Sequence, residues 1–168
     1  MVLELEKPRP IWQIMFSTHH TDIGLLYLIT SLAFLFLGGS LALAIRIELF
    51  LPNIEGTGQL IADSMTFNRI FTVHGTTLIF LFIIPFASAV GNYFVPIMVR
   101  YKDMAYPKLN AIAFWMIPPA AALVWLGFAD FTWYAQPPYS IISAPGPAAD
   151  MWIFGLKILG VSSVLGAI

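Results

Sequence analysis

Long apolar stretches are the feature that most constrains how this chain folds. Residues 23–45, 70–99 and 109–129 each form a run long enough to cross a hydrocarbon core, which takes about 20 residues. A fourth run begins near Met151 and is still apolar at residue 168. Lipid cannot satisfy backbone polar groups, and runs this long lack the alternation of barrel strands. The sequence predicts an all-α membrane protein, a transmembrane helix bundle with three full spans and the start of a fourth that we expect another chain segment to complete.

Charged residues are scarce and nearly balanced. Of the 168 residues 59% are hydrophobic and 10% are charged, with eight Lys and Arg against nine Asp and Glu, whereas soluble domains carry about 25% charged residues. No basic surface is offered to nucleic acid. The chain has no Cys, so any metal would use His, Met or oxygen ligands.

The distribution of Lys and Arg predicts the orientation of the spans. The first 21 residues form a tail that holds Lys7 and Arg9, and the second loop holds Arg100, Lys102 and Lys108. The first loop holds only Arg46 and Arg69, and the third loop holds no basic residue. The positive-inside rule then places the N-terminus and the second loop on the cytoplasmic or matrix side. The tail lacks the features of a cleaved signal, and we expect it to face solvent.

His74 is the only histidine inside a predicted span. Ionisable groups in spans are rare enough to be functional candidates. A neutral imidazole suits haem iron but also suits a hydroxyl partner in the bundle, so position alone leaves both open. Because His19 and His20 precede the first span, we expect them to lie at the membrane interface. A copper or zinc site there is disfavoured, because no other ligand lies nearby in the sequence.

A second polar group is expected at the inner end of the bundle. Asn92 follows His74 by eighteen residues, about five turns, so both face one side of a straight helix. Asp103 in the second loop and Asn110 at the start of the third span fall close to Asn92. A carboxylate and two amides can hold water and pass protons. Polarity alone favours a simpler role in loop capping and helix termination.

Three further charged residues lie near the outer face. Arg46 ends the first span and either bonds a cofactor substituent or snorkels. Glu48 is a weak signal for a calcium or sodium site. Lys157 lies about 9 Å into the fourth span, counted from Met151, and is expected to reach the outer interface by its own stem.

Prolines and glycines indicate bent, closely packed helices. Pro85 and the Pro118–Pro119 pair interrupt the second and third spans and should kink them. Four glycines would let helix backbones, or a flat cofactor, approach closely: Gly38, Gly39, Gly155 and Gly160. Helix packing is the simpler explanation for each of them.

Several segments together resemble a known family. The stretches STHHTDIGLLYL, FNRIFTVHGTTLIF, VGNYFVPIMVRYKDMAYPKLN, FWMIPP and GVSSVLGAI follow one another in order. They resemble the first four helices of the haem-copper oxygen reductase core subunit, cytochrome oxidase subunit I, in its mitochondrial-like branch. The resemblance covers residues 22–168 and implies the N-terminal portion of a twelve-helix fold.

The resemblance implies roles for residues near the outer face. His74, in TVHG, would be an axial ligand of a low-spin haem, with an a-type haem favoured, and Arg46, in AIRIE, would bond a substituent of its ring. Trp133 looks like the loop tryptophan close to the haem propionates. Glu48 looks like the carboxylate of an outer calcium or sodium site.

The resemblance also implies a proton-uptake route. Asp103, Asn92 and Asn110 would form its entrance, with Ser162 and Ser163 further along it. Departures from the family pattern lie nearby: Lys102 stands where a proline usually precedes the aspartate, and Ala111 replaces a second asparagine. Further departures are Ser88 and Ala89 for glycines and Gln136 for a tyrosine. They favour a prokaryotic branch, and so a prokaryotic cell membrane over the mitochondrial inner membrane.

The expected function is therefore that of a terminal respiratory oxidase. The complete assembly would reduce oxygen to water with electrons from cytochrome c or a quinol and move protons outward. The second low-spin ligand, the high-spin haem and the copper are expected in the remainder of subunit I, with other oxidase subunits as partners. A nitric oxide reductase is disfavoured, because Asp103 and the asparagines serve proton uptake in oxygen reductases. A non-catalytic membrane scaffold or assembly fragment is the rival from another class, and a transporter would explain the prolines but not the ordered motifs.

Overall fold

The computed structural model describes residues 10–50, 61, 63–129, 138 and 146–168. Within this part every regular element is helical: α1 (Ile11–Met15), α2 (His20–Phe50), α3 (Ser64–Thr76), a π-helix η1 (Thr77–Ile83), α4 (Ile84–Met98), α5 (Pro107–Trp115), α6 (Ile117–Gly127) and α8 (Pro147–Ala167). This confirms the predicted all-α fold. Trp133 lies outside the described residues.

Four helical runs are long and apolar enough to cross a membrane: His20–Phe50, Ser64–Met98, Pro107–Gly127 and Pro147–Ala167. The sequence predicted only the start of the fourth span. The structure begins it at Pro147, before the apolar run at Met151, and its 21 residues are sufficient to cross a bilayer.

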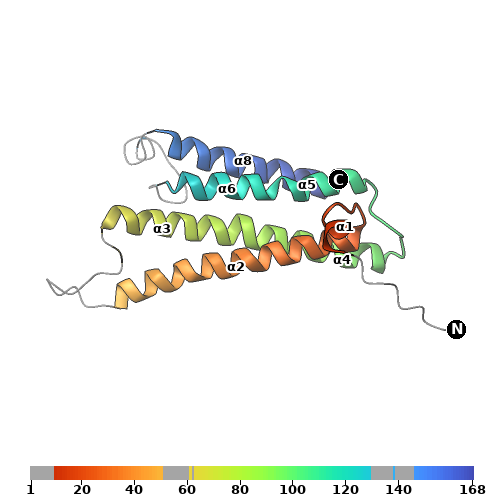
Figure 1. Cartoon of the computed structure of the whole chain (residues 1–168), viewed down its shortest axis with the longest axis horizontal. Coiled ribbons are helices and arrows are strands. Elements are labelled where there is room, and N and C mark those ends of the chain that lie inside the picture. The colour runs from red at the N-terminus through yellow and green to blue at the C-terminus, as the bar shows by residue number, and fades with distance from the viewer. Residues whose placement is uncertain (1–9, 51–60, 62, 130–137, 139–145) are drawn as a thin grey trace.

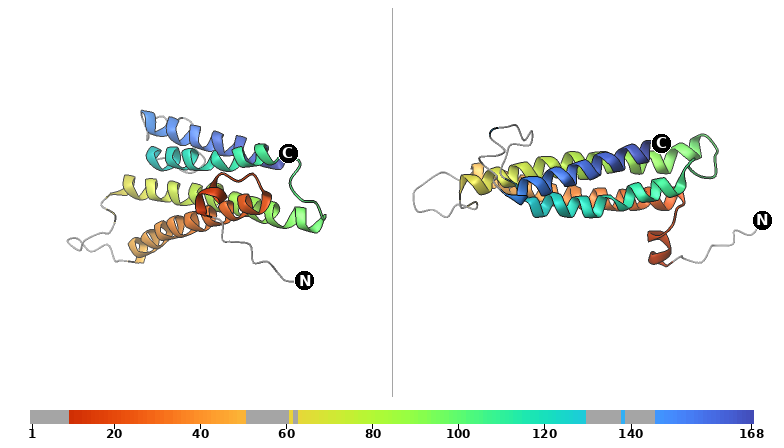
Figure 2. Two further views of the ribbon diagram at one scale, coloured as in Figure 1. Left: turned by 45° about the vertical axis from the view of Figure 1, so that its right-hand side comes forward. Right: turned by 90° about the horizontal axis from the view of Figure 1, so that it is seen from above.

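The spans run side by side as two hairpins (Figures 1 and 2). One pairs α2 with the continuous run α3–η1–α4, and the other pairs α5–α6 with α8. The hairpins meet through a shared core in which Tyr27 and Phe114 lie edge to face, their ring centroids 5.2 Å apart. Large side chains on the outside are largely exposed, Phe36 by 77% and Leu126 by 72%. An apolar exterior of this kind suits contact with lipid or with further protein.

The N-terminal tail contains structure that the sequence did not predict. The short helix α1 lies beside the end of the bundle where α2 begins, which we call the inner end and its opposite the outer end (Figure 2). The ring of Phe16 stacks on Trp115 of α5 at 5.8 Å. The tail is therefore not wholly solvent-facing, because one of its aromatic residues contacts the bundle. Residues 1–9 lie outside the described part.

Regular α-helix is interrupted beside the prolines at which the sequence predicted kinks. The π-helix Thr77–Ile83 ends just before Pro85, the second residue of α4. Pro has no N–H to donate and clashes with the preceding turn, and a wider π turn relieves both problems locally. The third span divides at Met116, after which Pro118 and Pro119 occupy the first turn of α6. Pro96, inside α4, was not singled out by the sequence analysis.

Both ends of the run α3–η1–α4 are stabilised locally. Asp63 caps α3 by accepting from the backbone N–H of Thr66 at 2.5 Å, and this hydrogen bond holds the pKa of the Asp63 carboxyl below its ordinary value. After α4 the chain reverses tightly. Tyr101 N donates to Pro96 O at 2.9 Å, while Arg100 adopts a left-handed φ of 59°, the conformation of a helix C-terminal cap.

Two of the four predicted glycines permit close helix packing. A Cβ at Gly38 would lie 2.7 Å from Leu78 Cδ2, and one at Gly155 would lie 2.8 Å from the backbone oxygen of Ala120. Nothing lies within 4 Å of a Cβ built at Gly39 or Gly160. Among these four glycines, the predicted close approach of neighbouring helices is therefore seen at Gly38 and Gly155 in the part of the chain that the structure describes.

Gly155→Ala should destabilise the contact between α6 and α8. The new Cβ meets backbone at 2.8 Å, so the helices must separate, at a cost of about 1–3 kcal/mol. The measurement is the midpoint of thermal denaturation of the purified complex that contains this chain. Gly91→Ala is the matched control, because its Cβ would meet nothing within 4 Å. Equal midpoints for the two variants would contradict this account of the packing.

Candidate functional site

His74 lies in the last turn of α3, half-buried against α2. Its Nδ1 lies 2.9 Å from the backbone oxygen of Gly38. A carbonyl oxygen can only accept, so Nδ1 carries the hydrogen and donates it. The lone pair of a neutral imidazole is then on Nε2, and the ring is oriented by the hydrogen bond.

This arrangement fits an axial ligand. Metal-binding histidines usually donate their other ring N–H to a carbonyl or carboxylate, which fixes the tautomer and raises ligand basicity. In the described part of the chain no three His, Cys, Asp or Glu side chains gather into a group able to hold a metal ion. A haem needs only axial ligands from protein because its ring supplies the other iron ligands. The donor set at His74 therefore fits a haem better than a metal held by protein alone.

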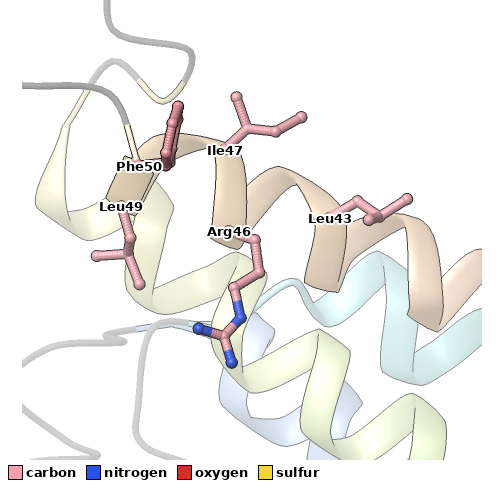
Figure 3. Close-up of a pocket in the computed structure, with 5 residues that line it drawn as sticks. All are labelled: Leu43, Arg46, Ile47, Leu49 and Phe50. Atoms are coloured by element: carbon pink, nitrogen blue, oxygen red, sulfur yellow. The ribbon is translucent and has the colours of Figure 1, made fainter.

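Arg46 and Glu48 lie near the outer end of α2. Arg46 is exposed, and its guanidinium extends away from Leu43 and Ile47, with which it lines an open hollow (Figure 3). Gly38 precedes Arg46 by eight residues, about 12 Å along the helix. Glu48 Oε2 accepts a hydrogen bond of 2.9 Å from the backbone N–H of Ile61. This contact ties Glu48 to the first loop, and its cation site stays a prediction.

The inner end of the bundle gathers the polar residues that the sequence singled out. Asn110 Nδ2 donates to Asn92 Oδ1, and Asn92 Nδ2 donates to Ser88 O at 2.9 Å. Asn92 and Asn110 are each only 4% exposed. Asn110 Oδ1 is buried and has no hydrogen-bond partner among the described residues. The two amides are thus linked, and one acceptor remains open to a further donor such as water.

His20 also joins this group, which the sequence did not predict. It is the first residue of α2, is only 4% exposed, and its Nδ1 donates to Asn92 O at 2.8 Å. Its backbone N–H donates to Asp103 Oδ1 at 3.1 Å. Asp103 therefore caps α2 from the second loop, as the simpler prediction of a capping role expected. His19, by contrast, is exposed and bonded to Thr21.

We name the set His20, Asn92, Asp103 and Asn110 the inner polar cluster. Its contacts join residues far apart in the sequence, since 83 positions separate His20 from Asp103. The sequence carried one signal for His20, its place directly before an apolar run. No pattern in the sequence indicated that Asp103 accepts the backbone N–H of His20.

The two serines lie further along the bundle from the inner polar cluster. Ser162 is buried and its hydroxyl donates to Ala113 O at 2.6 Å. Ser162 and Ser163 line a cavity of about 10 Å³ together with Tyr27 and Ser88. A space of that size is close to the minimum for one water molecule. Tyr27 and Ser88 were not predicted to take part.

Comparisons with known proteins agree with the resemblance. The family model described as Cytochrome C and Quinol oxidase polypeptide I matches residues 22–168. Cytochrome c oxidase subunit 1 of Synechocystis sp. is 40% identical over 99% of this chain and 30% of the relative. The protein of that name from Thermostichus vulcanus is 40% identical over 91% of the chain and 28% of the relative. Cytochrome c oxidase polypeptide 1 of Halobacterium salinarum is 39% identical over 97% of the chain and 28% of the relative.

The match is nearly complete for this chain and partial for its relatives. The chain spans about 30% of the length of the curated relatives it matches. The family model covers the four membrane-crossing helices from residue 22 onward, and it includes His74, Asn92, Asp103 and Asn110 but not His20. On this match the chain belongs to the cytochrome c and quinol oxidase polypeptide I family.

Proposed function

We propose that this chain forms part of the core subunit of a terminal respiratory oxidase, in which His74 is an axial ligand of a low-spin haem. The observation that carries the proposal is the hydrogen bond from His74 Nδ1 to Gly38 O. It selects the tautomer whose Nε2 lone pair can bind iron. The haem, when bound, supplies the one-electron chemistry of the site.

Other residues of the outer half suit the same role. Arg46 is exposed, and a guanidinium offers a fork of donors to a cofactor carboxylate or carbonyl. Gly39, next to Gly38, has open space where a side chain would stand, which leaves room for a flat ring. We propose Trp133 and Glu48 as the family's loop tryptophan and outer cation ligand, with calcium or sodium as the ion.

The inner polar cluster is proposed as the entrance of a proton-uptake route. Asp103 offers a carboxylate at the bundle end, and the buried amides of Asn92 and Asn110 donate and accept in sequence. The open acceptor Asn110 Oδ1 suits an ordered water that relays a proton. Ser162, Ser163 and the small cavity beside Tyr27 extend the polar path toward the middle of the bundle.

The remaining features of the assembly are proposed from the family. The second low-spin ligand, the high-spin haem and the copper would come from the rest of the longer polypeptide. Cytochrome c or a quinol would be the electron donor and other oxidase subunits the partners, and an a-type low-spin haem is favoured. The N-terminus and Asp103 would face the inside of a prokaryotic cell membrane, since basic residues concentrate in the tail and second loop.

His74→Ala should abolish the low-spin haem band in the reduced-minus-oxidised spectrum of the purified complex. The variant removes Nε2, the only proposed iron ligand in this chain. His19→Ala is the matched control, because His19 is exposed and its ring contacts Thr21 and His20, at the other end of α2 from Gly38 and Arg46. A low-spin band that survives His74→Ala at full amplitude would overturn the ligand role and favour a scaffold.

Asp103→Asn should slow oxygen consumption by about a hundredfold, the lower end of the effect of a lost proton-transfer group. The amide keeps an acceptor for His20 N–H, so the cap on α2 and the haem spectrum should persist. Asp150→Asn, an exposed carboxylate at the start of α8, is the control and should leave the rate unchanged. If Asp103→Asn turns over at the rate of the unaltered complex, the inner polar cluster is not the proton entrance.

A further inference from the structure

Lys157 lies well inside a membrane-crossing helix. It is the eleventh residue of α8, counted from Pro147, so the start of the helix is about 15 Å away. Counted from Met151, where the apolar run begins, Lys157 lies about 9 Å into the span, from where its stem would reach the outer interface. The helix begins four residues earlier than that estimate assumed, and a four-carbon stem is too short to cover the added depth.

The side chain of Lys157 lies on the face of α8 that turns away from the rest of the described chain. The opposite face is buried against α5 and α6, where Gly155 approaches Ala120 and Ser162 bonds Ala113. Gly155 and Leu159 are each two residues from Lys157, about 200° around the helix. Lys157 is exposed. On the outside edge of the bundle, α8 has no neighbour beyond it among the described helices (Figure 1).

Apolar residues surround Lys157 on this outer face. Ile153 lies one turn before Lys157 and Val161 one turn after, and Val164 follows on the same stripe; they are 37%, 51% and 63% exposed. We name these four residues the outer stripe of α8. A stripe of this spacing is the face that a neighbouring helix covers, and the lysine places a single positive charge at its centre.

Nothing in the described part of the chain neutralises this charge. No hydrogen bond or ion pair joins Lys157 to another described residue. The only acidic residue of α8, Asp150, is seven positions away, about 10 Å along the helix. Charged side chains at this depth face protein or a water-filled cavity rather than lipid, and they pair with an opposite charge.

We infer that the outer stripe of α8 packs against a further membrane helix that presents an Asp or Glu carboxylate to Lys157. Charge complementarity selects the partner, because an ammonium on an otherwise apolar stripe is neutralised by a carboxylate at the same depth. We assign this helix to the longer polypeptide of the family, since the match covers only about 30% of its relatives. The inference rests on family membership and does not depend on the proposed oxidase activity.

The test compares two substitutions of Lys157 in the complete membrane complex. Lys157→Met keeps the length of the side chain and removes its charge, which would leave the partner carboxylate unpaired within protein. Recovery of the chain in the intact complex, measured by native gel electrophoresis of solubilised membranes, should fall about tenfold. Lys157→Arg keeps the charge, and recovery should stay within about twofold of the unaltered complex.

Ile153→Met on the same stripe is the matched control and should be recovered normally. If α8 faced lipid at this point, Lys157→Met would be recovered as well as or better than the unaltered chain, and the inference would be overturned. Equal losses for Lys157→Met and Lys157→Arg would also overturn it, because shape and not charge would then decide. Recovery is measured without reference to haem or turnover, so failure here leaves the proposed function standing.

Discussion

The hydrogen bond between His74 Nδ1 and Gly38 O is the interaction on which the proposed haem site in the outer half of the bundle depends. It joins α3 to α2 at 2.9 Å. The helices are close together beside it, where a Cβ on residue 38 would lie 2.7 Å from Leu78 Cδ2. A single hydrogen bond between two helices thus fixes both the tautomer and the orientation of the proposed iron ligand.

The same helix, α2, organises the inner half. His20 at its first turn donates to Asn92 O, and Asp103 receives the backbone N–H of His20. The charged entrance of the proposed proton route is therefore also the cap of a membrane helix. Capping and proton uptake are compatible, because a carboxylate with two oxygens can accept from a helix N-terminus and still face water.

The sequence predicted the fold and the main polar residues well, because both follow from local patterns. Long apolar runs specify membrane helices, and the eighteen-residue spacing of His74 and Asn92 predicted that both residues lie on one side of their helix. In the structure both residues contact α2, at Gly38 and His20. Contacts between distant segments were less accessible. The hydrogen bond from His20 N–H to Asp103 joins residues 83 positions apart, and the depth of Lys157 depends on where α8 begins. The helix begins at Pro147, beside a proline-rich stretch, and the first residues of the helix are less apolar than those after Met151. The apolar run alone therefore did not indicate where the helix begins.

The most direct test of the central claim is an electron cryomicroscopy map of the complete purified complex in its oxidised state. The account predicts continuous density between His74 Nε2 and a haem iron, with Nδ1 still within hydrogen-bonding distance of Gly38 O. A map in which every haem iron is ligated by other residues, and the His74 ring contacts only protein, would contradict it.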